Sequence, residues 1–151
     1  MIPPVPSDPP GPAGPPGPAW APEAAGPSGP LGIVLVSGTH ERAHFAFVLA
    51  AGAAAVGRRV VLFATNRGCL ALLVDPSGLD GAGRDETVRA RGVAGLAELR
   101  EAAAELGVRL LACDAGLRAE AIPAADLMPG VEVAGVPTFL DAARGGQLVS
   151  L

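Results

Sequence analysis

Short β-branched runs alternate with longer alanine- and leucine-rich segments, and this feature constrains the fold of the chain most. Extended runs predicted at 32–37, 59–64 and 108–113 are separated by segments whose apolar residues recur at helical spacing. Strands that alternate with helices form parallel sheets with helical crossovers. The sequence therefore predicts an α/β domain over residues 31–151, with three layers (α/β/α) and a mainly parallel sheet of about five strands.

The remaining elements are predicted from caps and breakers. A helix is expected from about residue 40 to 56, closed by Gly57, and another from Leu96 to Gly107. Between these helices, a short helix is predicted at 69–74 and a glycine-rich loop at 75–84. After the third strand, the sequence predicts a broken helical stretch at 116–128 and a short strand at 132–133. A segment that opens at Pro137 and a final strand at 148–151 complete the domain.

The first thirty residues differ in composition from the rest. Residues 1–30 hold twelve of the sixteen prolines and lack the basic and apolar regions of a signal peptide. Three collagen-like triplets at 11–19 are too few for a triple helix. We expect a disordered or polyproline-II tail.

Charge and hydropathy limit the classes of partner. The net charge of −4, with eleven basic and fifteen acidic residues, gives no electrostatic reason to expect nucleic acid or an anionic membrane. The uncharged stretch 43–57 is about five residues short of a bilayer span. A helix that is apolar on all faces is normally buried by a sheet on one side and by another helix or a subunit on the other, so a homo-oligomer is expected.

The two cysteines, Cys69 and Cys113, are too few for a disulfide framework. Neither they nor His40 and His44 show the spacing of a metal site, so no metal and no cofactor are predicted. A reducing compartment, the cytoplasm, is the expected location.

Cys113 ends the third predicted strand and directly precedes a predicted helix. The carboxyl edge of a parallel sheet is where open α/β folds bind ligands, and a helix N-terminus favours the thiolate form. A carboxylate beside a thiol disfavours the thiolate, so we expect Asp114 to oppose this effect and Arg118 to offset Asp114. The alternative is that Cys113 is a small buried hydrophobe, as most free cysteines are.

Two further residues belong to the same predicted edge. Cys69 follows the second strand as Cys113 follows the third, so it is either a resolving thiol or a packing residue. His40 follows the first strand and would stabilise a thiolate as an imidazolium. The turn at 37–40 is either a phosphate site of the flavodoxin-like kind or a plain N-cap formed by Ser37 or Thr39.

The segments "VRLLACDAGLRAEAI" (108–122) and "GVEVAGVPTFL" (130–140) resemble the DsrE/DsrF/DsrH-like family, and its peroxiredoxin-like branch in particular. The resemblance extends to "GIVLVSGTHERAHFAFVLAAGAAAVGRRVVLFATNRGCLALL" (32–73) and so covers residues 31–151. It implies a small α/β protein that often forms oligomers, and in several members a cysteine after the third strand that accepts sulfur as a persulfide. Cys113 occupies that position.

The resemblance therefore implies a sulfur carrier that works with donor and acceptor proteins through Cys113. A non-catalytic assembly or regulatory module of the same fold, in which the thiol is incidental, is the alternative. Thiol peroxidase activity, which the branch name suggests, is a third hypothesis.

Overall fold

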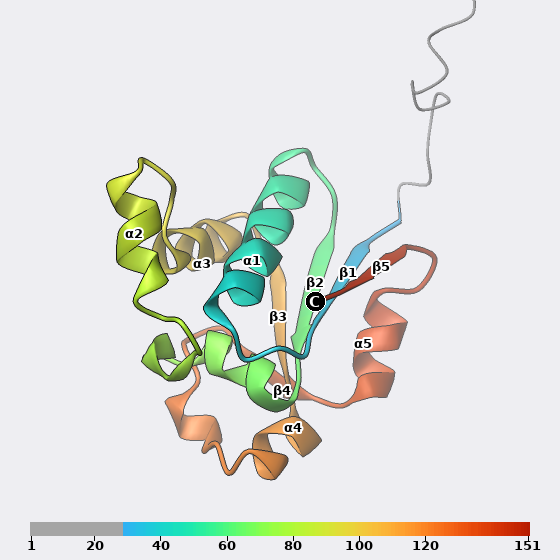
Figure 1. Cartoon of the computed structure of the whole chain (residues 1–151). Helices are drawn as coiled ribbons and strands as arrows, with labels where there is room; N and C mark the ends of the chain where they lie inside the picture. Colours follow the sequence, from blue (N-terminus) through green and yellow to red (C-terminus); the bar gives the residue numbers. More distant parts are fainter. Residues whose placement is uncertain (1–28) are drawn as a thin grey trace, which may run out of the picture.

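The computed structural model describes residues 29–151, so all but the end of the predicted tail lies outside the described residues. Five strands form one sheet in the order β4-β3-β2-β1-β5 (Figure 1). Every strand pairing is parallel. The strands are β1 (Leu31–Leu35), β2 (Val60–Ala64), β3 (Arg109–Cys113), β4 (Glu132–Ala134) and β5 (Gln147–Ser150). The predicted α/β class and parallel sheet are confirmed.

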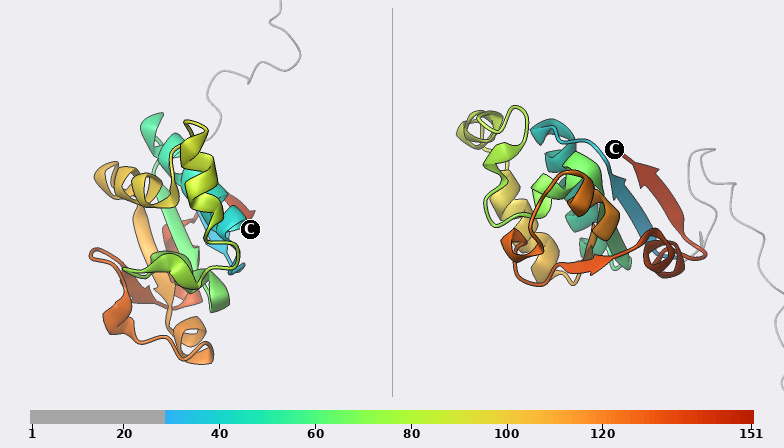
Figure 2. Two further views of the ribbon diagram at one scale, coloured as in Figure 1. Left: turned by 60° about the vertical axis from the view of Figure 1, so that its left-hand side comes forward. Right: turned by 90° about the horizontal axis from the view of Figure 1, so that it is seen from below.

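Helices cover the two faces of this sheet unequally. On one face pack α1 (His40–Ala55), α3 (Leu96–Glu105) and the 3-10 helix η1 (Asn66–Leu72). On the other face α5 (Val136–Ala142) packs over Val61 and Phe63 of β2. The two views in Figure 2 place α1 and α5 on opposite sides of the strands, which completes three layers.

The alternation of side chains along the strands decides which core each residue joins. Ile33 and Leu35 of β1 belong to the larger core under α1, and both are fully buried. Leu111 and Cys113 of β3 belong to the smaller core under α5. Because side chains alternate between the faces of a strand, Cys113 points away from α1.

The predicted limits of the main helices agree with the structure. Thr39 is the N-cap of α1, and its side chain accepts a hydrogen bond from the amide of Arg42. Helix α1 ends at Ala55, and Gly57 follows with φ +84°, in the left-handed region that favours glycine.

Two parts of the chain differ from the prediction. The expected loop 75–84 contains the 3-10 helix η2 (Pro76–Gly78). The stretch 116–128, by contrast, is broken as predicted, into α4 (Asp114–Ala119) and the 3-10 helix η3 (Ala124–Asp126) with Pro123 between them. Helix α2 (Arg84–Ala90) was not predicted. It buries none of its residues, so it lacks the apolar periodicity by which a helix is recognised in a sequence.

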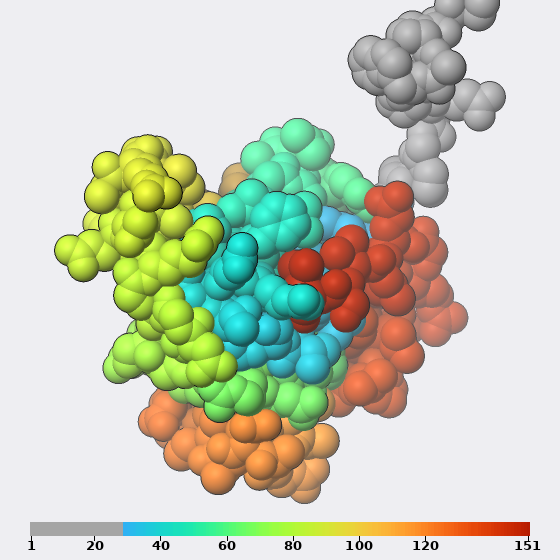
Figure 3. Space-filling view, in the orientation of Figure 1, coloured from blue at the N-terminus to red at the C-terminus, as the bar shows by residue number. Residues whose placement is uncertain are grey.

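Within residues 29–151, no helix is both long enough and apolar enough to cross a membrane. Helix α1 packs against the sheet and against α3, but its outer side stays exposed in the single chain. Phe45 is 49% exposed and Val56 is 78% exposed. Figure 3 shows α1 across the middle of this surface, with α2 to one side and the C-terminal segment to the other.

Candidate functional site at the carboxyl edge of the sheet

Cys113 is the last residue of β3 and the N-cap of α4. Its Sγ accepts a hydrogen bond from the amide of Gly116 at 3.4 Å. The residue is 5% exposed and lies in the smaller core with Phe63 and Phe139, whose rings stack with centroids 5.1 Å apart. The thiol therefore has an amide donor on one side and an apolar surface on the other.

Gly116 allows α4 to pack closely against the segment after β2. A Cβ at Gly116 would lie 2.5 Å from the backbone nitrogen of Asn66 and 2.8 Å from Oγ1 of Thr65. Real Cβ atoms do not approach other atoms so closely, so this position requires glycine. The close approach fixes the amide that faces the thiol.

The charged neighbours of Cys113 pair with each other, as predicted. Arg118 donates a hydrogen bond from Nη2 to Oδ2 of Asp114, four residues earlier on the exposed side of α4. The carboxylate that follows Cys113 in the sequence is therefore paired with a cation of the same helix.

Cys69 lies in η1 and is fully buried in the larger core, on the α1 side of the sheet. Its Sγ–H donates to the carbonyl of Ala64 at 3.4 Å. Burial raises the pKa of this thiol to about 11, although the backbone of Cys113 acts in the opposite direction. The structure thus places the two free thiols in different cores and gives Cys69 the contacts of a packing residue.

His40 begins α1 and is 2% exposed. Its Nε2–H donates to Oδ1 of Asp85 at 2.9 Å, while its Nδ1 has no hydrogen-bond partner among residues 29–151. Burial alone would raise the pKa of Asp85. The Leu96 amide, His40 and Arg89 together lower it below its ordinary value. The carboxylate therefore ties α1 to the start of α3.

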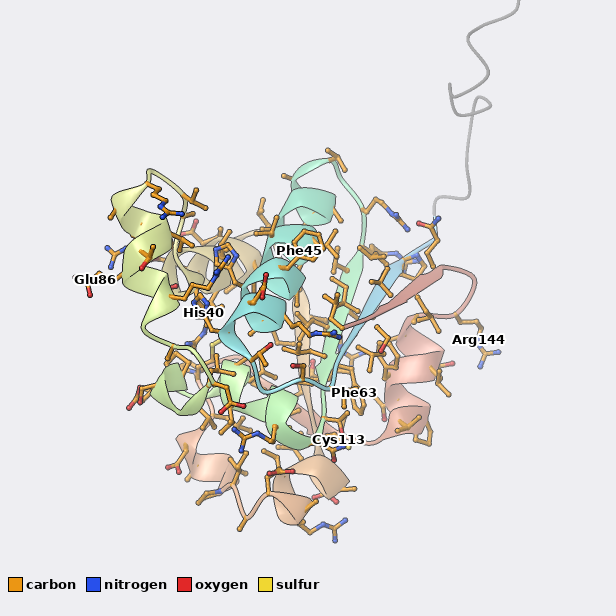
Figure 4. All side chains as sticks on the ribbon, viewed as in Figure 1. His40, Phe45, Phe63, Glu86, Cys113 and Arg144 are labelled. Carbon is orange, nitrogen blue, oxygen red and sulfur yellow. The ribbon has the colours of Figure 1, made fainter. Side chains whose placement is uncertain are left out.

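The structure does not bring His40 to Cys113. Figure 4 shows the two side chains well apart, with His40 beside α2 and Cys113 near α4. His40 interacts instead with Asp85 and with the ring of His44, whose centroid is 5.7 Å away. Gly116, and not His40, supplies the hydrogen bond to the thiol.

The turn between β1 and α1 has the hydrogen bonds of an N-cap. The amide of Thr39 donates to Oγ of Ser37 at 3.2 Å, and the Thr39 hydroxyl caps the helix. The capping alternative, with Thr39 as the N-cap, describes this turn. Across residues 29–151, no cluster of three or more His, Cys, Asp or Glu side chains has the geometry to hold a metal ion.

Sequence reasoning missed two residues with unusual surroundings. Asp85 gives no local signal, because its partner His40 is 45 residues away. Arg100 does give one, since it shares the helical face of Leu96 and Ala103 and is only 8% exposed. A charged residue on the apolar face of an amphipathic helix is recognisable from spacing alone.

The fold and the site can now be compared with known proteins. The model of the DsrE/DsrF/DrsH-like family matches residues 77–149, which contain β3, Cys113 and α4. The match covers 73 of the 151 residues and supports membership of the chain in this family. No curated protein matches the chain.

Two solved structures are similar to this DsrE-like chain. One is the ychN protein from E. coli, at 14% identity and a TM-score of 0.63, covering 82% of this chain and 99% of that one. The other is MTH1491 from Methanobacterium thermoautotrophicum, a protein of unknown function, at 17% identity and a TM-score of 0.48, covering 81% and 99%. At this identity the first likeness establishes the DsrE-like fold.

Proposed function

We propose that this DsrE-like protein carries sulfur as a persulfide on Cys113. The main support is the position of Sγ of Cys113, which lies at the carboxyl edge of β3 and accepts a hydrogen bond from the Gly116 amide. A hydrogen-bond donor at a helix N-cap stabilises a thiolate more than a thiol. The thiolate is the form that attacks a donor sulfur.

The proposed reaction needs no external oxidant or reductant. The Cys113 thiolate attacks the outer sulfur of a donor persulfide, and a new S–S bond forms as the donor bond breaks. The donor leaves as a thiolate with the electron pair of that bond. An acceptor thiolate then attacks the outer sulfur on Cys113 and regenerates the Cys113 thiolate. The proposed partners are a sulfur donor and a sulfur acceptor protein, in the reducing cytoplasm where free thiols persist.

Two cysteines of contrasting surroundings give the test a matched control. Reduced native protein, Cys113→Ser and Cys69→Ser are incubated with polysulfide, desalted and analysed by intact mass. The native chain and Cys69→Ser should gain one sulfur atom, while Cys113→Ser should gain none. Circular dichroism checks that both variants fold. Loading of Cys113→Ser to the native extent, or an unloaded native chain, would refute the proposal.

A second function is favoured by the outer side of α1, and it concerns assembly. Phe45 and Val48 are exposed on this helix and Val56 directly after it, and no atom of residues 29–151 lies within 4 Å of the Cβ position of Gly52 between them. An apolar helix surface of this kind is normally covered. We propose that a second copy of the chain covers it, in a homo-oligomer.

Sedimentation separates the two functions. Phe45→Glu should lower the mass of the particle, whereas Leu140→Glu, at a similarly exposed position on α5 (52% against 49%), should not. A monomeric native chain would contradict the assembly. If Cys113 stays unloaded and Phe45→Glu dissociates the particle, the assembly module is the better account of this protein.

A further inference from the structure

Arg100 of α3 is a buried cation without an anion. It is 8% exposed, and it forms no ion pair with a carboxylate of residues 29–151. Arginine is rarely buried unless a charged partner accompanies it. Its guanidinium cannot lose its proton at neutral pH, so the charge persists in this environment.

The hydrogen bonds of Arg100 leave one edge of the guanidinium open. Nη2 donates to the carbonyl of Leu73 and to Sδ of Met128, and Nε donates to the same sulfur at 3.2 Å. A thioether sulfur is a weak acceptor. Nη1 has no hydrogen-bond partner among residues 29–151, and unlike Nδ1 of His40 it is not fully buried.

Arg100 lines a cavity of about 290 Å³ beside α3 that is broadly open to solvent. The other walls are mainly apolar, with Glu101 as the one carboxylate: Val74, Ala97, Glu101, Ala104, Met128 and Pro129. Glu101 is exposed and forms no ion pair with Arg100. The cavity therefore combines one unpaired cation and one exposed carboxylate with otherwise apolar walls.

We propose that this cavity binds a small organic carboxylate, with the carboxylate on Nη1 of Arg100 and an aliphatic chain against Val74, Met128 and Pro129. A single negative charge matches the single cation. The planar guanidinium also suits a carboxylate. The apolar walls favour an organic anion over a bare inorganic one. Burial removes water from the guanidinium and so lowers the pKa of Arg100. A bound anion would stabilise the charged form that burial disfavours.

Butyrate is a suitable probe, and uncharged butyramide is its control. Both are titrated into the full chain while the alanine methyl signals of Ala97 and Ala104 are followed by NMR. Butyrate should shift these signals saturably and butyramide should not. Arg100→Gln should weaken butyrate binding about tenfold or more. Arg144→Gln, on an exposed arginine of the segment after α5, should leave binding unchanged.

A second variant tests the cavity without touching the buried charge. Ala104 is exposed at the rim, so Ala104→Leu should fill the cavity and abolish butyrate binding, while Ala55→Leu on α1 should not. Cys113→Ser should bind butyrate as the native chain does, so the outcome is independent of sulfur transfer. Absent saturation, equal shifts with butyramide, or native binding in both Arg100→Gln and Ala104→Leu would overturn the proposal. Binding of inorganic phosphate as tight as that of butyrate would refute the claim that the aliphatic chain of the ligand contributes to binding.

Discussion

Removal of the Asp85 carboxylate should destabilise the fold although Asp85 lies on an exposed helix. Its Oδ1 accepts two hydrogen bonds, from Nε2 of His40 at 2.9 Å and from the amide of Leu96 at 2.7 Å. Both donor residues are buried, at 2% and 3% exposure. Asp85→Ala leaves both donors without an acceptor.

The expected loss follows from these two donors. A buried donor that loses its partner costs about 1–3 kcal/mol. The side chain of Asp85 is 27% exposed, so water can reach part of the vacated space, and the lower half of the summed range applies. We expect Asp85→Ala to lower the free energy of unfolding by about 2–4 kcal/mol. Asp85→Asn, which keeps an acceptor oxygen, should lose less.

Urea unfolding at several pH values measures this effect. The pKa of Asp85 is lower in the folded state than in the unfolded state, so its ionic stabilisation is complete above the unfolded value, about 3.9, and is lost as the pH falls through the folded value. The difference in unfolding free energy between native and Asp85→Ala should therefore shrink as the pH falls below about 4. Asp80→Ala, which breaks an exposed pair with Arg67, is the control and should cost less than about 0.5 kcal/mol. Equal losses in the two variants would refute the reasoning.

Three other outcomes are expected. Gly116→Ala should lower the free energy of unfolding by about 1–3 kcal/mol in urea titrations, since its Cβ would lie 2.5 Å from the nitrogen of Asn66; native stability would contradict that contact. Iodoacetamide at pH 8 should alkylate Cys113 before Cys69, because the pKa of Cys69 is about 11; peptide mass spectrometry that found Cys69 modified first would show the reverse order. Phe47→Ala should cost about 3–5 kcal/mol in the same titrations, because Phe47 is fully buried, and a loss below about 1 kcal/mol would show that the core under α1 repacks.

Most of the fold could be predicted because its signals are local. The three central strands are β-branched or leucine-rich runs, and the observed β1, β2 and β3 lie within one or two residues of the predicted limits. Glycine after α1 marks the end of that helix, since few other residues adopt φ +84°. Helix α2 escaped prediction because it buries no side chain.

The candidate site was predictable only in part, because its contacts join distant segments. The position of Cys113 at the end of β3 follows from the strand pattern. Alternation along β3 fixes which face its side chain occupies, but no pattern fixes the face of Cys69, which lies in a 3-10 helix beyond the end of β2. The pairing of His40 with Asp85 likewise depends on how α2 and α3 fold back onto α1.

Asp85 and Cys113 lie on opposite faces of the sheet near its carboxyl edge, and we assign them different roles. On the α1 side, Asp85 pairs with a buried imidazole and fixes the start of α3, so it serves stability. On the α5 side, Cys113 is 5% exposed in the smaller core, where it packs with Phe63 and Phe139. In the proposed sulfur transfer, a donor persulfide therefore reaches the thiol only when this core opens locally, and α5, which supplies Phe139, is the helix that packs over it. The rate of sulfur loading should therefore depend on how firmly α5 packs against the sheet.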